Sequence, residues 1–238
     1  MSLTVDLPRR LVAEGLGTCL LVAAVIGSGI MAEQLSDGNT GVALLANTIA
    51  TGGALVALIH TFGPVSGAHF NPAVTLADTV LGALRPAEGA AYTVAQVAGG
   101  IAGAVLADAM FELPLVAWSQ HARTGPAQWL GEFVATFGLL GVIASCTRRT
   151  PAVTPWAVAA WIVGAYWFTS STSFANPAVT VARAFTDTFA GIRPVDVPGF
   201  VVAQVVGALA AVAVFGWLVP PLRAVEPAGV KEPRRVVS

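Results

Sequence analysis

The string Asn-Pro-Ala-Val-Thr occurs twice in the chain, once from Asn71 and once from Asn176. Asparagine is a strong helix N-cap, and proline suits the first helical position, where its missing N–H costs nothing. Each string therefore predicts the start of a helix. Each asparagine amide can also donate a hydrogen bond to a passing oxygen. The paired motifs are therefore predicted to meet a polar solute, with plain helix capping as the alternative. The residues of the two motifs are Asn71, Pro72, Ala73, Asn176, Pro177 and Ala178.

Two carboxylates stand inside apolar segments, and each precedes a threonine by four residues: Glu14 in "AEGLGT" and Glu132 in "GEFVAT". An ionisable group in such a place suggests a function by default. One interpretation is a proton-coupled carrier site. The other is a brace, in which each carboxylate accepts hydrogen bonds from backbone N–H groups of nearby loops.

Other chemistry is not indicated. No nucleophile, base and orienting group converge along the chain, so an enzyme is not expected. The two cysteines, Cys19 and Cys146, lie in different segments without metal-ligand spacing, so no disulfide framework, metal site or cofactor is expected.

The composition is that of an integral membrane protein, with the lipid bilayer as its partner. Charged residues make up 11% of the 238 residues and hydrophobic residues 55%, and the mean hydropathy is +0.75. Soluble domains carry about 25% charged residues. The net charge of −1 gives no indication of a nucleic-acid partner.

The elements that would position these residues are predicted to be helices throughout, in an all-α membrane protein. Six apolar segments are long enough to cross a bilayer, which takes about 20 residues. Each Asn-Pro-Ala motif lies between two of them and is followed by about ten helix-compatible residues, too few to cross. Because non-helical backbone persists at membrane depth only when it is buried or lines water, two re-entrant half-helices are expected. The six segments are roughly 10–31, 41–62, 88–110, 128–147, 154–170 and 196–219.

Three blocks of the first half recur in the same order in the second half. The pair Glu-x-x-x-Thr recurs, "NPAVT" is unchanged, and "RPAEGAAYTVAQV" returns as "RPVDVPGFVVAQV". Each half, about 10–110 and 128–219, holds three crossings, so the second half must be inverted relative to the first. Inverted repeats with interrupted helices that meet near the midplane are a known membrane architecture for moving solutes.

The basic residues predict the orientation of the single domain, 10–219, and its flanks. Nine Lys and Arg residues fall on one side, and three, Arg123, Arg183 and Arg193, fall on the other. The positive-inside rule then places both the N-terminus, 1–9, and the tail, 220–238, in the cytoplasm. The proline-broken tail is predicted to be disordered.

On these motifs, together with "SGAHFNPAVT", the chain from about Arg9 to Val219 resembles the aquaporins and aquaglyceroporins, or major intrinsic proteins. The resemblance implies six crossing helices and two half-helices around a central pore, usually as a homotetramer in the cell membrane, here a bacterial inner membrane. It also favours the brace for Glu14 and Glu132, as in the family. Both half-helices would direct their positive dipole ends at the midplane, which disfavours cations and protons but not neutral solutes.

The resemblance further implies a constriction of four residues, and spacing from the two motif asparagines, Asn71 and Asn176, places it at Thr51, Gly164, Ser173 and Val179. Water-selective and glycerol-passing members carry an arginine directly after the second Asn-Pro-Ala, where this chain has Val179. All four residues are small or apolar, so a wide, uncharged ring is expected. This predicts a passive channel for neutral solutes such as glycerol and urea, with a water leak. Relatives with this valine are associated with bacterial arsenic handling, which adds metalloid hydroxides and methylated arsenicals.

Two further residues and two further functions stay open. His69 is predicted to line the cytoplasmic vestibule. Arg183 either supplies a displaced positive charge at the extracellular mouth or forms a surface pair with Asp187, four residues on. The alternative functions are an ordinary water and glycerol facilitator without an arsenic role, and an ion-coupled secondary transporter. A transporter would need Glu14 and Glu132 as its ion site.

Overall fold

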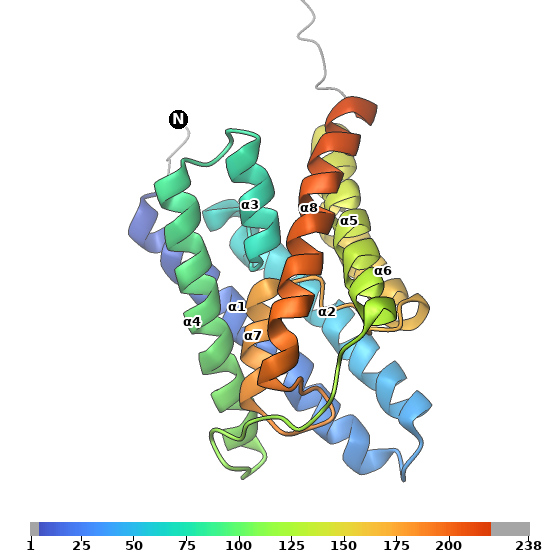
Figure 1. The fold of residues 1–238 in the computed structure, drawn as a ribbon. Helices are drawn as coiled ribbons and strands as arrows, with labels where there is room; N and C mark the ends of the chain where they lie inside the picture. The colour runs from blue at the N-terminus through green and yellow to red at the C-terminus, as the bar shows by residue number, and fades with distance from the viewer. Residues whose placement is uncertain (1–4, 220–238) are drawn as a thin grey trace, which may run out of the picture.

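The computed structural model describes residues 5–219, so the predicted tail, 220–238, lies outside the described residues. Within residues 5–219 the chain forms eight α-helices and no strand, packed as one bundle (Figure 1). The helices are α1 Leu7–Leu35, α2 Thr40–Ser66, α3 Pro72–Val80, α4 Pro86–Met110, α5 Pro126–Arg149, α6 Thr154–Phe168, α7 Pro177–Ala182 and α8 Val197–Leu218.

Five of the predicted crossings are helices that are long and apolar enough to span a membrane: α1, α2, α4, α5 and the segment Pro194–Leu218, which contains α8. The sixth, α6, lies where it is predicted but has 15 residues. That is about 22 Å at 1.5 Å per residue. A short 3₁₀ turn, Pro151–Val153, precedes it and lengthens the segment.

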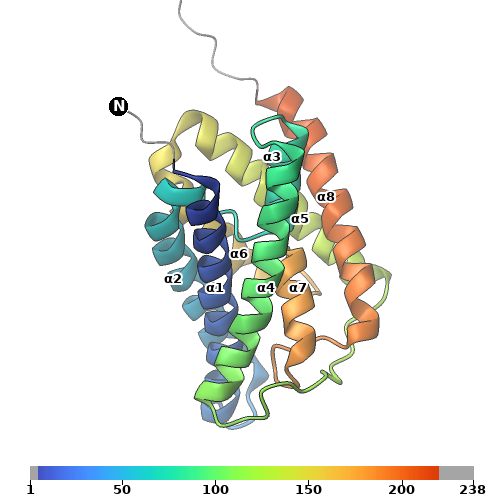
Figure 2. The same cartoon turned by 90° about the vertical axis from the view of Figure 1, so that its left-hand side faces the viewer.

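The two half-helices, α3 and α7, are short because each is confined to one half of the bundle (Figure 2). Each begins at the proline of an Asn-Pro-Ala motif. The preceding asparagine Oδ1 accepts a hydrogen bond from the backbone N–H of the motif's alanine, at 2.9 Å in both copies. The expected N-caps are therefore formed.

Close helix crossings hold each half together. On α4, a Cβ on Gly99 would lie 2.1 Å from the carbonyl oxygen of Gly15 on α1, and a Cβ on Gly103 would lie 2.3 Å from that of Cys19. On α8, a Cβ on Gly207 would lie 2.6 Å from the carbonyl oxygen of Phe133 on α5. Only glycine allows two helix backbones to approach this closely, as small residues do in membrane helices generally.

The first turn of α1 and the last turn of α8 lie at the same end of the bundle, called here the terminal end (Figure 1). The long connection between α4 and α5, residues 111–125, crosses the opposite end, called here the loop end. The C-terminus of α3 faces the terminal end and that of α7 faces the loop end (Figure 2).

Candidate functional site

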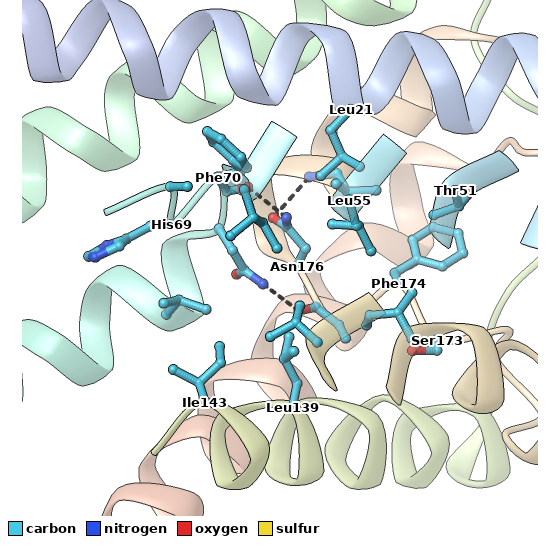
Figure 3. A pocket seen from close by; sticks show the side chains of 18 of the residues that line it. Leu21, Thr51, Leu55, His69, Phe70, Leu139, Ile143, Ser173, Phe174 and Asn176 are labelled. Atoms are coloured by element: carbon cyan, nitrogen blue, oxygen red, sulfur yellow. Dashed lines mark hydrogen bonds between the residues drawn. The ribbon is translucent and has the colours of Figure 1, made fainter. Parts of the chain in front are cut away.

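A cavity of about 360 Å³ occupies the centre of the bundle, where the N-termini of α3 and α7 meet. His69 and Asp78 line it toward the terminal end, and Tyr166 and Arg183 line it toward the loop end. Figure 3 shows Asn176 in the middle, with His69 on one side and Thr51, Ser173 and Phe174 on the other. Much of the wall is aliphatic: Leu21, Val25, Leu55, Ile59, Val74, Leu139, Ile143, Val158, Ile162 and Val179.

The two motif asparagines both line the cavity and join the two halves to each other. Asn71 Nδ2 donates to the carbonyl oxygen of Ala175, and Asn176 Nδ2 donates to that of Phe70, each at 2.7 Å (Figure 3). Because a side-chain amide has two N–H donors, each asparagine keeps a second one for a solute.

The carboxylate of Glu14 is fully buried and holds the loop before α3. Its Oε1 accepts from the backbone N–H of His69 at 3.0 Å and from the hydroxyl of Ser66 at 2.6 Å. Its Oε2 accepts from the backbone N–H of Phe70 at 2.7 Å and from Nε2 of Gln96 at 2.8 Å. These are the contacts of a brace.

The carboxylate of Glu132 repeats this arrangement before α7. It accepts from the backbone N–H groups of Phe174 and Ala175, both at 2.8 Å, and from Nε2 of Gln204 at 2.6 Å. Neither glutamate is exposed or lines the cavity. An ion-coupled carrier would need a carboxylate open to the solute path, so the geometry favours the brace.

The braced loops have unusual backbone. Ala68 and Phe70 have φ of +51° and +49°, and their counterparts 105 residues on, Ser173 and Ala175, have φ of +51° and +47°. Left-handed backbone is uncommon for residues other than glycine and persists where the surroundings enforce it. The two glutamates supply that enforcement, because each accepts from two successive N–H groups of its loop.

The glutamines that complete the braces were missed as site residues in the sequence. Gln96 and Gln204 each connect a glutamate to a threonine hydroxyl of a half-helix, Thr75 at 2.9 Å and Thr180 at 2.8 Å. The signal was present, because both glutamines lie in the repeated Ala-Gln-Val. A buried polar residue that recurs in an apolar helix needs a partner.

Three of the four predicted constriction residues, Thr51, Ser173 and Val179, line the cavity, but Gly164 does not. Gly164 is exposed on the outside of α6, and a Cβ there would meet only Phe168, at 3.8 Å. The prediction of Gly164 as a ring residue is therefore wrong. The cavity face of α6 recurs every four residues, at Thr154, Val158, Ile162 and Tyr166, and position 164 points away from it.

The predicted position is wrong because residues 169–175, between α6 and Asn176, are not helical. Spacing along the sequence from Asn176 therefore does not identify the face of α6 that meets the cavity. The residue of α6 that faces this level of the cavity is Tyr166, whose hydroxyl lies 3.4 Å from Oγ1 of Thr51. Phe174 also lines the cavity there. The expectation that every member of the constriction is small or apolar therefore fails.

At the terminal end of the cavity, His69 contacts the charged residue Asp78. His69 Nε2 lies 3.1 Å from Oδ2 of Asp78, and His69 Nδ1 lies 3.0 Å from Oγ1 of Thr75. His69 thus lines the cavity with its ring held on both sides by α3.

At the loop end, Arg183 lines the cavity and is only 3% exposed. Its Nε donates to the carbonyl oxygen of Ala190, and its Cζ lies 3.4 Å from the ring centroid of Phe174. Asp187 instead accepts from the backbone N–H of Gln120 at 2.8 Å. The predicted surface pair of Arg183 with Asp187 is therefore wrong. Arg183 is the C-cap of α7 and keeps its helical spacing, so its side chain stays on the cavity face of that helix.

A second arginine, Arg123, reaches the same place from the 111–125 connection. Its Cζ lies 5.1 Å from the ring centroid of Phe174, and its Nε donates to the carbonyl oxygen of Gly191 at 2.8 Å. Burial lowers the pKa of the Arg123 guanidinium. No local sequence signal indicates this role, because a loop residue reaches the site only through the tertiary fold.

Comparisons with known proteins identify relatives of the chain. Residues 1–170 match the sequence profile "Major intrinsic protein". The chain is 57% identical over 218 residues to "Aquaglyceroporin AqpS" of Rhizobium meliloti (strain 1021), covering 92% of this chain and 93% of that protein. It is 35% identical over 164 residues to "Aquaporin NIP1-4" of Oryza sativa subsp. japonica, covering 64% and 55%.

Among solved structures, the X-ray structure of the aquaglyceroporin from Plasmodium falciparum matches with a TM-score of 0.65. The match covers 88% of this chain and 96% of that chain at 20% sequence identity, and it therefore bears on the fold. In residues 5–219, no group of three or more His, Cys, Asp and Glu side chains is placed to hold a metal ion.

Proposed function

Because the chain belongs to the major intrinsic protein family and is an aquaglyceroporin channel, we propose that its cavity passes neutral solutes larger than water without coupling to an ion gradient. The solutes are glycerol, urea, neutral metalloid hydroxides and methylated arsenicals. Water leaks through the same path.

The observation that carries this proposal is Val179, which lines the cavity directly after the second Asn-Pro-Ala motif. A guanidinium at this position would occupy the lumen and bind a solute strongly. A valine leaves that space free. The aliphatic side chains of the wall then accommodate the carbon or metalloid centre of a solute, while the second amide N–H groups of Asn71 and Asn176 meet its oxygens.

The constriction in this proposal is formed by Thr51, Tyr166, Ser173 and Val179, with Tyr166 in place of Gly164. The helix dipoles of α3 and α7 direct partial positive charge toward the asparagines from both sides. At the asparagines this charge disfavours a cation but not a neutral solute, because the carboxylate that lines the cavity, Asp78, lies away from them at the terminal end.

The channel is a multi-pass membrane protein, and we propose that both termini lie in the cytoplasm, so that the terminal end of the bundle is cytoplasmic. The exposed apolar residues of the outer surface, among them Trp156, Trp167 and Trp217, would contact lipid and neighbouring subunits. A bacterial inner membrane and a homotetramer, with one cavity per subunit, complete the proposal.

The test is solute flux into vesicles that contain the purified protein. Glycerol and arsenous acid are offered separately, with proton and sodium gradients collapsed by ionophores, and protein-free vesicles give the background. The proposal predicts fast uptake of both solutes with or without the gradients. Uptake that disappears with the gradients would favour the ion-coupled transporter, and glycerol uptake without arsenous acid uptake would favour an ordinary water and glycerol facilitator.

A further inference from the structure

Two corresponding pairs of side chains stand at the two ends of the cavity. Two residues before each motif asparagine is a ring, His69 or Phe174, and seven residues after it is a charged side chain, Asp78 or Arg183. In each half the ring contacts the charge: His69 Nε2 lies 3.1 Å from Asp78, and the Phe174 centroid lies 3.4 Å from Cζ of Arg183. Corresponding positions thus present a negative charge at one end of the cavity and a positive charge at the other.

The positive end has no acidic partner. Among residues 5–219, the guanidinium of neither Arg183 nor Arg123 forms an ion pair with a carboxylate, and Asp196 accepts only from the backbone N–H of Arg123. Their side chains donate instead to neutral acceptors, including the carbonyl oxygens of Ala190, Gly191 and Phe189. Backbone carbonyls orient a guanidinium without neutralising it, and the carboxylate of Glu132, behind Phe174, binds backbone N–H groups of the loop rather than either guanidinium, so both positive charges stay beside Phe174 without an ion pair.

The positive end also faces the solute path. Arg183 lies four residues after Val179, so both are on one face of the α7 segment, and both line the cavity. The hydroxyl of Ser173, itself 2% exposed and lining the cavity, has no hydrogen-bond partner. The free hydroxyl of Ser173 and the guanidinium N–H donors suit the oxygen of a solute, and the guanidinium charge disfavours a cation.

We propose that Arg183, supported by Arg123, is the residue that excludes cations and protons from this channel, one helical turn outside the position where Val179 carries no charge. The inference rests on the proposed function, because it assumes that the cavity is the solute path. It separates two properties: Val179 leaves space in the constriction, and Arg183 supplies the charge just beyond it.

The experiment measures potassium efflux and proton leak in vesicles, each divided by the amount of inserted protein, with glycerol flux measured in the same vesicles. Arg183→Gln should raise both leaks about tenfold or more. A unit charge a few ångströms from an ion, at an effective dielectric constant of about 20, acts on it by more than the roughly 1.4 kcal/mol that a factor of ten represents. Glycerol flux should stay within about twofold of the unchanged protein.

Arg183→Lys separates charge from packing, because lysine retains the charge and loses the planar contact with Phe174. It should leak like the unchanged protein. Arg193→Gln is the matched control, since Arg193 belongs to the same side but its charge is balanced by Asp196 at 2.9 Å. It should change neither leak.

Arg123→Gln provides an independent variant if Arg183→Gln is not inserted, because it leaves the contacts of Arg183 in place. Its leaks should rise about threefold. The proposal is overturned if normally inserted Arg183→Gln leaks no more than the unchanged protein, if Arg183→Lys and Arg183→Gln leak alike, or if Arg123→Gln has no effect. Absence of glycerol flux in the unchanged protein would instead overturn the proposed function.

Discussion

The two half-helix modules of this channel share a scaffold and differ in charge. The shared part is the asparagine cap, the left-handed loop and the buried glutamate with its glutamine, which recur with nearly equal distances. The difference lies at the mouths, where Asp78 contacts a histidine and Arg183 contacts a phenylalanine. Residues that hold the backbone are therefore fixed by hydrogen bonding in both halves, whereas the side chains that meet the solute at each mouth differ.

The largest effect is expected from removing a brace. Glu14→Leu leaves two backbone N–H groups and a glutamine amide buried without their acceptor, at about 1–3 kcal/mol for each group. Glu132→Leu does the same in the other half. Both variants should lose most of the stably folded channel, as measured by membrane-inserted protein and by thermal unfolding in detergent. Glu33→Gln, on the exposed surface of α1, is the control. Loss in one half only would show that the scaffold is not shared.

Substitutions at the close helix crossings should have the next largest effect, and the loss of stability should be greater in the first half than in the second. Gly103→Val places a Cβ 2.3 Å from a backbone oxygen of α1, and Gly207→Val places one 2.6 Å from a backbone oxygen of α5. Backbone cannot yield as a flexible side chain does, so each should destabilise by about 1–3 kcal/mol or more, with Gly103→Val the worse. Gly53→Val, whose Cβ would meet nothing within 4 Å, should be tolerated. Equal tolerance at positions 53 and 103 would contradict the close crossing.

The corrected constriction is tested on α6. Tyr166→Ala removes an aromatic side chain that lines the cavity, and should raise glycerol flux several-fold. Gly164→Ala adds a methyl group on the outer face, next to Phe168 at 3.8 Å, and should leave flux unchanged. Stopped-flow light scattering on matched amounts of inserted protein measures both. The opposite result would restore Gly164 to the constriction.

The smallest effect is expected at the acidic mouth. The Asp78 side chain is 39% exposed, so its contact with His69 contributes only about 0–1 kcal/mol to stability. Asp78→Asn should change glycerol flux by less than about twofold. In an Arg183→Gln background, where a cation leak is large enough to measure, it should reduce that leak. An increase would mean that the two mouths do not act as opposite charges on one path.

The sequence predicted most of the scaffold because the scaffold leaves a local pattern. Apolar length indicated the crossings, Asn-Pro-Ala indicated the half-helix starts, and the repeat of Glu14 at Glu132 indicated paired braces. Each of these depends on a few neighbouring residues. A repeat within one chain also doubles the signal, so the sequence alone pairs the two buried glutamates.

The positions of the other site residues could not be predicted, because they depend on how loops and helix faces meet in the tertiary fold. Gly164 was misplaced because helical counting does not carry through the left-handed turns before Asn176. The sequence left two environments open for Arg183 because regular α-helical spacing ends at this residue, so that Asp187, four residues on, no longer shares its face. Arg123 contacts the site from a connection whose path is set by distant residues, since its backbone N–H donates to Asp196 at 2.8 Å.

The most direct test of the central claim, that neutral solutes larger than water pass beside Val179, is flux through Val179→Arg and Val179→Trp. Water, glycerol and inserted protein are measured in the same vesicles. The account predicts that both variants lose glycerol flux far more than water flux, because each side chain fills the lumen. The tryptophan variant keeps the test valid if a third buried arginine beside Arg183 and Arg123 prevents insertion. Normal insertion with unchanged glycerol and water flux would show that Val179 does not line the path, and the account would be wrong.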